Sequence, residues 1–290
     1  MIDRADLDHV AVATEDQRPA WLRYAGELGG QYDGGGPSPG FWAGQVAYAN
    51  GMRVEVLEPA NVEQNDFLRR FLDRNGPGPH HLTFKVPDIR QALAAAEQAG
   101  YRPVSVDLSN PWWQEAFLHP KDAPGVVVQL AHSAENAEGG EAGDGEGGEG
   151  DGWGGSPPQP MPPSRTPEPA TLTYVGHAVA SLDDGRRLFA DLLGGRETAS
   201  GEDEAARWIE LGWPGPGRVR LLEPRSSGSP LAAWLEGRRG RVHHIAFTVS
   251  EPDELAGATP LADGRYEVPP EANLGVRLLL TDVSSAAARG

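Results

Sequence analysis

Four short segments in the first 132 residues read as β-strands, and on one face each carries one side chain of a type that binds metal ions. The segments are 8–12, 53–57, 80–84 and 126–130, and the side chains are those of His9, Glu55, His81 and Gln129. Because side chains alternate along a strand, the flanking apolar residues point to one face and these four point to the other. His9 and His81 are 72 residues apart and Glu55 and Gln129 are 74 apart, as duplication of a smaller unit would give. We therefore predict two similar half-units that bring four ligands to one metal centre.

Two neutral imidazoles, one carboxylate and one amide oxygen suit one divalent ion, and Co, Ni, Mn, Zn and Fe are the candidates. In octahedral geometry this ligand set leaves two open positions, which suit a substrate with two vicinal oxygens. The chemistry we expect is removal of a proton next to a carbonyl, with the metal stabilising the resulting enolate or enediolate. Glu55 is the one carboxylate among the four residues and is therefore the predicted catalytic base.

Three further side chains are candidates for substrate binding. Arg53 and Lys85 share the face of the ligands two or four positions away from them, so they are placed to meet an anionic substrate. The alternative is that both side chains lie on a solvated rim of the sheet and contact no substrate. Trp113 is predicted to form a wall at the mouth of the pocket, with ordinary packing as the alternative.

Composition narrows the class of protein. The chain has 290 residues, 39% of them hydrophobic, which is enough for two domains with cores. Without cysteine, any metal must be held by imidazole, carboxylate or amide groups. A net charge of −17 argues against nucleic acid as a partner. No apolar run is long enough to span a membrane and the first residues lack the layout of a signal peptide, so we expect a cytoplasmic protein that acts on a small molecule.

An acidic, glycine-rich and then proline-rich segment over 133–170 divides the chain. It holds too few apolar residues to offset its ordering entropy, so we predict a flexible linker. The predicted domains are 1–132 and 171–290, and the second repeats the first. The repeated segments are 8–13 with 176–180, 28–30 with 193–195, 56–59 with 221–224, and 80–86 with 243–249.

Each copy reads as strand, helix and three strands, followed by the same order again, which is an α+β pattern. The first helix is predicted to start near Pro19 and to end at Gly29 and Gly30. Another is predicted to begin with Asp88 as N-cap and to end at Gly100.

These residues resemble the vicinal oxygen chelate superfamily, which includes glyoxalase I, methylmalonyl-CoA epimerase, extradiol dioxygenases and bleomycin-resistance proteins. The resemblance covers most of 5–132 and, more weakly, 171–283, and it is carried by the Asp8-His9-Val10 segment, by 54–59, by the paired histidines within 76–84, and by 117–121 followed by 125–126. The first domain is most similar to methylmalonyl-CoA epimerase and glyoxalase I. The resemblance implies paired βαβββ modules that form cupped mixed sheets, two tandem domains, and a divalent metal held by the first and last strand of each module.

Carried over to this sequence, the ligand roles fall on His9, Glu55, His81 and Gln129. Bacterial epimerases tend to place glutamine at the first module end and glutamate at the second, and this chain has the reverse order. Those epimerases also often carry a glutamate on the neighbouring strand, where this chain has Gln45. In the second domain, His177 and His244 remain.

The carboxylate and amide positions of the second domain hold Arg220 and Leu279 instead. An arginine cannot ligate a cation, so we predict that this degenerate domain has lost its metal and that its two histidines are structural. It then acts as an intrachain pseudo-dimer partner for the first domain, with a homodimer of the whole chain as an additional assembly.

The expected function is a metal-dependent epimerase, isomerase or lyase that acts next to a carbonyl. His9, His81 and Glu55 also form the two-histidine, one-carboxylate set of non-haem iron oxygenases, so a dioxygenase of the extradiol type is one alternative. A metal-free binding protein that sequesters an antibiotic is the other.

Overall fold

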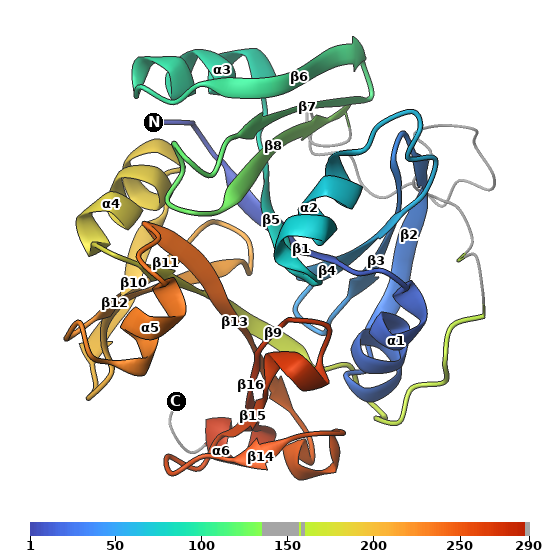
Figure 1. Cartoon of the computed structure of the whole chain (residues 1–290), viewed down its shortest axis with the longest axis vertical. Coiled ribbons are helices and arrows are strands. Elements are labelled where there is room, and N and C mark those ends of the chain that lie inside the picture. The colour runs from blue at the N-terminus through green and yellow to red at the C-terminus, as the bar shows by residue number, and fades with distance from the viewer. Residues whose placement is uncertain (135–156, 158–159, 288–290) are drawn as a thin grey trace. The chain divides into compact units, whose positions relative to one another are not determined.

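Two eight-stranded mixed sheets form the framework of the chain in a computed structural model, which describes residues 1–134, 157 and 160–287 (Figure 1). The strands of the first sheet are β1 (Asp6–Ala13), β2 (Gln31–Ser38), β3 (Phe41–Ala47), β4 (Arg53–Pro59), β5 (Gly78–Lys85), β6 (Pro103–Asn110), β7 (Trp113–Leu118) and β8 (Val127–Ser133). Its helices are α1 (Gln17–Trp21), which continues as the π-helix η1 (Leu22–Glu27), α2 (Phe67–Asn75) and α3 (Ile89–Gln98).

The second sheet repeats this plan. Its strands are β9 (Thr171–Val179), β10 (Arg196–Glu202), β11 (Ala206–Gly212), β12 (Arg218–Pro224), β13 (Gly240–Val249), β14 (Thr259–Pro260), β15 (Tyr266–Val268) and β16 (Leu278–Asp282). Its helices are α4 (Leu182–Arg186), η3 (Arg187–Leu192), α5 (Pro230–Leu235), η4 (Pro252–Glu254), η5 (Pro270–Ala272) and α6 (Val283–Ala287).

The strand order is the same in both sheets and confirms the predicted duplication. It runs β2-β3-β4-β1-β5-β8-β7-β6 in the first and β10-β11-β12-β9-β13-β16-β15-β14 in the second. In the first sheet the pairs β1/β4 and β5/β8 are parallel, whereas the outer strands pair antiparallel. The first and last strand of every module therefore lie side by side at the centre of a sheet. The predicted α+β class with two tandem domains of paired βαβββ modules is confirmed.

The helices begin and end where side chains satisfy their free backbone groups. α3 begins after Asp88, whose carboxylate accepts hydrogen bonds from the backbone N–H groups of Arg90 and Gln91, as predicted. The first helix, predicted to start near Pro19, starts at Gln17, where the side chain of Asp16 caps it by accepting from Arg18 N. It ends before Gly29, which has a φ of 69°.

The helix α2 was not among the predicted elements, and it covers apolar residues on the face of the sheet that also holds His9 and Glu55. Its buried residues Leu68 and Leu72 pack in a cluster with residues of β1, β3 and β4, which are Ala11, Ala13, Ala43 and Leu57. Ala11 and Ala13 alternate in phase with His9, and Leu57 alternates in phase with Glu55. This face of the strands is therefore polar at one end and apolar at the other.

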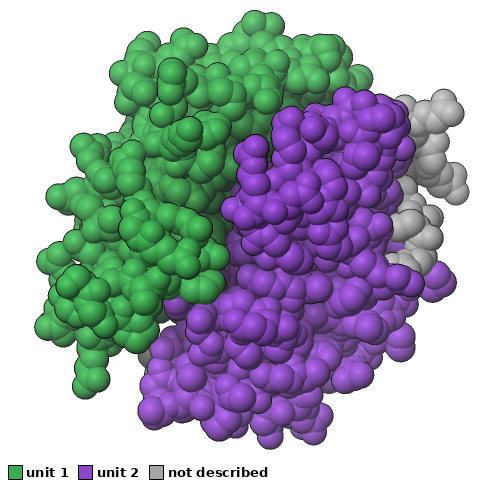
Figure 2. All heavy atoms as spheres, viewed as in Figure 1, with its two compact units in different colours: residues 1–8, 81–152, 176–242 green, residues 9–80, 153–175, 243–290 purple. Residues whose placement is uncertain are grey.

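The chain divides into two compact units, and each takes residues from both sheets (Figure 2). One unit consists of 1–8, 81–152 and 176–242, and the other of 9–80, 153–175 and 243–290. In the first unit, the ring of Phe84 lies 5.0 Å from that of Trp213 and 6.4 Å from that of Phe189. In the second unit, the rings of Tyr48 and Phe247 are 4.9 Å apart. Each unit is thus an intrachain pair of one module from the first half and one from the second.

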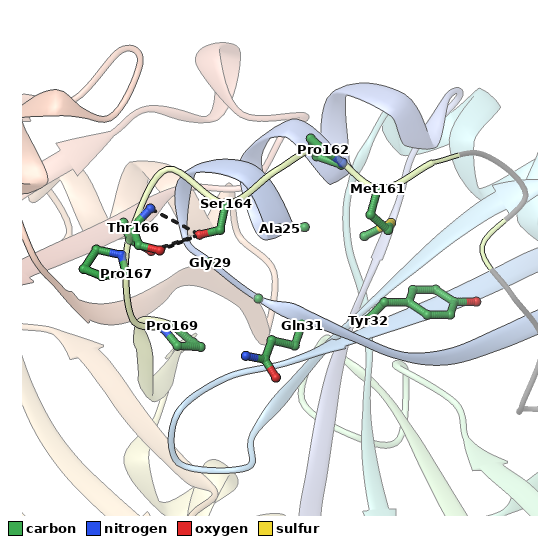
Figure 3. Close-up of a pocket in the computed structure, with 11 residues that line it drawn as sticks. Ala25, Gly29, Gln31, Tyr32, Met161, Pro162, Ser164, Thr166, Pro167 and Pro169 are labelled. Carbon is green, nitrogen blue, oxygen red and sulfur yellow. Dashed lines mark hydrogen bonds between the residues drawn. The ribbon is translucent and has the colours of Figure 1, made fainter.

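The segment between the sheets is described from residue 160 onward, and there it docks on the first half of the chain. Arg165 N donates to Gly26 O at 2.8 Å, Ala170 N donates to Leu28 O at 2.9 Å, and Ala49 N donates to Ala170 O at 3.0 Å. A hollow of about 320 Å³ lies between 161–169, the end of η1 and the start of β2 (Figure 3). No carboxylate, imidazole or amine side chain lines it. The predicted flexibility concerns mainly 135–156 and 158–159, which lie outside the described residues.

Of the helices the structure describes, none is both long and apolar enough to cross a lipid bilayer.

Candidate metal centre

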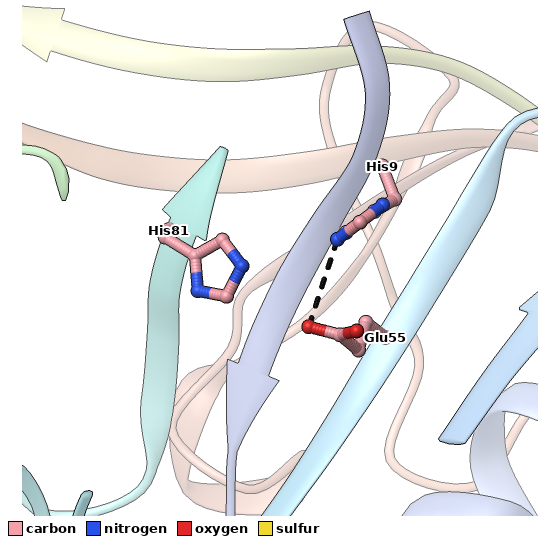
Figure 4. Close-up of side chains that lie close together, drawn as sticks. All are labelled: His9, Glu55 and His81. Carbon is pink, nitrogen blue, oxygen red and sulfur yellow. Dashed lines mark ion pairs between the residues drawn. The ribbon is translucent and has the colours of Figure 1, made fainter. Parts of the chain in front are cut away.

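Three of the four predicted ligands converge. The ligand atoms of His9, Glu55 and His81 all lie within 4.8 Å of one another (Figure 4). The three residues are 1%, 4% and 6% exposed, and His9 Nε2 lies 3.6 Å from Glu55 Oε2. They come from β1, β4 and β5, which are neighbours at the centre of the first sheet. In the parallel register of β1 and β4, Ala11 lies opposite Glu55, so the carboxylate is a diagonal neighbour of His9 on the same face.

The donor set fits a divalent cation. Two imidazole nitrogens and one carboxylate oxygen are ligands that Zn, Fe, Co, Ni and Mn accept. Burial of a glutamate beside two histidines is costly unless the carboxylate meets a positive charge or hydrogen-bond donors. A cation between the three groups would supply that charge. Among residues 1–134, 157 and 160–287, no second cluster of three or more histidine, aspartate or glutamate side chains meets the same distance criterion.

A neighbouring amide orients the carboxylate of Glu55. Gln45 lies directly opposite Glu55 in the antiparallel pairing of β3 and β4. Its Nε2 donates a hydrogen bond of 3.1 Å to Glu55 Oε1. Oε1 thus contacts Gln45, and Oε2 faces His9. The hydrogen bond from Gln45 holds the carboxylate with Oε2 toward the two imidazoles.

Gln129, the predicted fourth ligand, is 7% exposed on β8 and lies opposite Thr83 of β5. Thr83 Oγ1 donates to Gln129 Oε1 at 2.6 Å, and Gln129 Nε2 donates to Glu115 Oε2 at 2.6 Å. Both ends of the amide are therefore hydrogen-bonded, with the oxygen on the side of β5. Its role as a metal ligand stays a prediction.

Glu115, on β7, is a candidate that sequence reasoning missed. Trp113 Nε1 donates to Glu115 Oε2 at 2.9 Å, beside the bond from Gln129. Phe117 lies two residues further along the same strand, with its ring 6.3 Å from that of His81. Ala116 lies between Glu115 and Phe117, Leu118 follows Phe117, and both are buried on the opposite face. The signal was present in the sequence as the alternation of 113–118, which places residues 113, 115 and 117 on one face.

The predicted substrate-binding residues have protein partners in the structure. Lys85 Nζ lies 4.0 Å above the ring of Trp113 and donates to Ser133 Oγ at 3.3 Å. Arg53 pairs with Asp33 of β2. Lys85 and Trp113 thus form one contact pair next to Glu115, whereas the charge of Arg53 is already balanced. Their roles in substrate binding stay predictions.

Comparison with known proteins identifies the family of this chain. Residues 8–134 match the model of the glyoxalase/bleomycin resistance protein/dioxygenase superfamily. Human mitochondrial methylmalonyl-CoA epimerase is 31% identical over 129 residues, which cover 43% of this chain and 72% of that protein. The chain belongs to the glyoxalase/bleomycin resistance protein/dioxygenase superfamily. This confirms the resemblance found in the sequence.

One more sequence relative and one solved structure are also similar to this chain. An ethylmalonyl-CoA/methylmalonyl-CoA epimerase from Cereibacter sphaeroides is 29% identical over 130 residues, 43% of this chain and 95% of that protein. A triple mutant of 4-hydroxymandelate synthase from Streptomyces coelicolor matches 96% of this chain and 92% of its own, with a TM-score of 0.62 and 15% identity. The similarity between this chain and the synthase is one of fold.

The second sheet of this superfamily member has a different set of side chains at the positions of the centre. In the β11/β12 register, Glu210 and Arg220 occupy the places of Gln45 and Glu55. Arg220 Nη2 lies 2.7 Å from Glu210 Oε2, and its guanidinium stacks 4.4 Å from the ring of Trp208. In the β13/β16 register, Leu279 occupies the place of Gln129. The first strand of this sheet keeps its histidine but uses it differently.

His177 is fully buried, and its Nε2 lies 2.7 Å from Pro124 O, with which it forms a hydrogen bond. Burial lowers the pKa of His177 to about 4, while the bond to the carbonyl acts in the opposite direction. A neutral histidine tied to the backbone has the structural role that the sequence predicted.

Proposed function

We propose that this chain is a divalent-metal-dependent epimerase that moves a proton next to a carbonyl, with malonyl-type CoA thioesters as the first substrate class to test. The convergence of His9, Glu55 and His81 within 4.8 Å carries the proposal. The epimerase names of the two relatives that match the first half support the reaction and the substrate class. Isomerases and lyases that act next to a carbonyl use the same first step and belong to the same proposal.

His9, Glu55 and His81 would hold one metal, with the oxygen of Gln129 as the fourth ligand. The bound metal would act as a Lewis acid for the carbonyl oxygen and stabilise negative charge that develops there. Its identity, among Co, Ni, Mn, Zn and Fe, is a matter for measurement.

Glu55 is our candidate for the base. Its Oε1 accepts a hydrogen bond from Gln45, and its Oε2 lies among the imidazoles, so the carboxylate has a fixed orientation in a buried site. A carboxylate held in this way takes a proton without first reorganising solvent. Burial also excludes bulk water from the proton in transfer.

Lys85 and Trp113 are our candidates for substrate contacts beyond the reacting carbon. The ammonium of Lys85 is held over the indole, which gives a cationic contact with an apolar flank for an anionic substrate. Arg53 can join them only if the substrate competes with Asp33 for its guanidinium. We therefore expect a larger loss of substrate affinity from Lys85→Gln than from Arg53→Gln.

The domain arrangement is also a proposal. We propose a metal-binding domain over 1–132 and a degenerate domain over 171–290, joined by a linker over 133–170, because β1–β8 form one sheet and β9–β16 form another. Packing divides it differently, because each compact unit combines one module from each half. We propose that the second domain stabilises the first as a partner and holds no metal of its own.

The test combines metal content with proton exchange. The chain is loaded in turn with each of the five metals, and elemental analysis should give one equivalent. NMR in D2O should then show exchange of the α-proton of methylmalonyl-CoA, which a chelator abolishes. Arg220→Gln in the second sheet is the matched control and should change neither result.

Two outcomes would replace the proposal. Metal-dependent oxygen uptake with a catechol would favour the extradiol-type dioxygenase, whose two-histidine, one-carboxylate set is also present here. Binding of a small molecule without metal and without turnover would favour a sequestering protein.

A further inference from the structure

We propose that the ring of Phe117 forms the wall of an apolar subsite that receives the alkyl group on the α-carbon of the substrate, and that Phe117 thereby limits the size of that group. The inference rests on the proposed function and deepens it, because malonyl-type thioesters differ from one another in this alkyl group. Phe117 lies on β7, which is separated by β8 from β5, the strand that carries His81.

Phe117 contacts one member of the candidate metal centre directly. Its ring centroid lies 6.3 Å from that of His81, and the two rings are nearly perpendicular, with an interplanar angle of 88°. This is one of the two geometries that aromatic pairs prefer. Both residues belong to the compact unit that contains 81–152, so the contact is made within one unit. A group held at the centre beside His81 therefore has the ring of Phe117 as a neighbour.

The strand register adds two apolar side chains to the same face. Val104 lies directly opposite Phe117 in the pairing of β6 and β7, and Val127 lies opposite His81 in the pairing of β5 and β8. Phe117 in turn lies opposite Gln129 of β8. Residues opposite each other in a sheet point to the same side of it. We call Val104, Phe117 and Val127 the apolar shelf, and all three belong to the same compact unit as His81.

The apolar shelf keeps part of its surface accessible. Val104 is 39% exposed, and Phe117 and Val127 are partly buried. Ala116 and Leu118, the neighbours of Phe117 on the opposite face, are both 0% exposed. One face of β7 is thus packed in the core, whereas the face with the shelf is open to a ligand. Binding sites for small molecules combine apolar surface of this kind with a few polar groups.

The alkyl group on the α-carbon is the occupant that fits this shelf. In a malonyl-type thioester the α-carbon carries the proton to be removed, two carbonyl carbons and one alkyl group. The carbonyl oxygens suit the polar groups of the centre, and the alkyl group is stabilised by contact with apolar surface. Because the ring of Phe117 is rigid and is held against His81, its position sets how long an alkyl group can be.

The competing interpretation is that Phe117 packs against His81 and holds its imidazole in place without touching the substrate. The two interpretations differ in substrate selectivity. Loss of packing lowers the turnover of every substrate by the same factor. Loss of a wall favours the substrates with larger alkyl groups over those with smaller ones.

The experiment uses the full metal-loaded chain with methylmalonyl-, ethylmalonyl- and butylmalonyl-CoA, and NMR in D2O gives kcat/KM for α-proton exchange of each. In Phe117→Ala, we expect the ratio of kcat/KM for butylmalonyl-CoA to that for methylmalonyl-CoA to rise by at least about 10-fold over wild type, since one methylene in an apolar pocket changes such a ratio by about 10-fold or more. Phe117→Leu should raise it by a smaller factor, and it decides the outcome if Phe117→Ala does not fold. Leu22→Ala truncates a side chain that is 58% exposed on η1, and as the matched control it should leave the ratio unchanged.

Binding without turnover is the second readout. The compounds 2,2-dimethylmalonyl-CoA and 2-butyl-2-methylmalonyl-CoA have no α-proton and cannot react. Calorimetry should show that Phe117→Ala binds the butyl compound more tightly, relative to the dimethyl compound, than the wild type does. Elemental analysis should give the same metal content in the variants as in the wild type.

An unchanged ratio in the variants, an equal loss with all three thioesters, or loss of metal would overturn the inference and leave the proposed function in place. Absence of α-proton exchange from every thioester in the wild-type chain would overturn the proposed function and this inference with it.

Discussion

The two sheets of this chain have the same strand order and differ in what they place at the centre. In the first, Gln45 hydrogen-bonds Glu55, which faces two histidines. In the second, Glu210 and Arg220 occupy those places and neutralise each other. A strand pair thus tolerates either a neutral amide with a carboxylate or a full ion pair, because both satisfy the polar groups across the same register. The fold forms with either pair of side chains, whereas a metal centre requires the pair that contains the free carboxylate.

The largest effect should come from copying the second sheet into the first. Glu55→Arg places a cation beside two imidazoles, removes the carboxylate, and should abolish metal binding altogether. Elemental analysis after loading measures this, and circular dichroism checks that the variant folds. The reverse change, Arg220→Glu, should gain no metal, since His177 Nε2 is already bonded to Pro124 O and Leu279 offers no fourth ligand. A metal-loaded Glu55→Arg protein would mean that the triad is not the centre.

The second largest effect should separate the two module ends within the first sheet. Glu55→Gln removes the proposed base and should lower kcat/KM for α-proton exchange by about 10² to 10⁴-fold. Gln129→Glu keeps an oxygen ligand and should cost about 10-fold, since the new carboxylate repels Glu115 instead of donating to it. Steady-state kinetics on the metal-loaded variants decides the order. If both variants retain full activity, Glu55 is not the base.

The smallest effect concerns the histidine that the second sheet keeps in a structural role. The folded protein resists protonation of His177 down to a pKa of about 4, whereas the unfolded chain takes up this proton near pH 6.5. The stability due to this residue is therefore complete above pH 6.5 and decreases as the pH falls toward 4, by about 3 kcal/mol at most.

The variant His177→Gln tests this, because its amide can still donate to Pro124 O but does not titrate. Urea unfolding at several pH values between 4 and 7.5 should show a shallower decrease of the free energy of unfolding in the variant than in the wild type. Parallel curves would show that His177 is not buried in its neutral form.

Much of this comparison could be predicted from the sequence. Alternation along 53–57 and 126–130 places Glu55 and Gln129 opposite their apolar neighbours, and the repeated segments align Arg220 and Leu279 with them. These signals are local and periodic, so one sequence suffices to find them. The first helix starts two residues before Pro19, because the side chain of Asp16 caps it, and Pro19 lies within its first turn.

Other features had weaker signals or none. Glu115 reaches Gln129 as a diagonal neighbour across β7 and β8, where Phe117 is the direct partner, so no spacing rule links the two residues. The packing of Phe84 on Trp213 joins segments about 130 residues apart, and neither segment has a sequence pattern that identifies the other as its packing partner. The docking of 160–170 relies on backbone hydrogen bonds, which sequence composition does not encode.

Covalent linkage of the two sheets also changes how the molecule can evolve. In a homodimer of identical modules, every substitution appears twice and must be tolerated at both symmetric positions. Here each compact unit pairs one module from each half, and the two halves are separate stretches of one gene product. A change of residue at one position, such as Arg220 where the first sheet has Glu55, then alters one sheet and leaves the other unchanged. Tandem duplication thus lets the side chains at the centre of one sheet diverge from those of the other, while both sheets keep the same strand order.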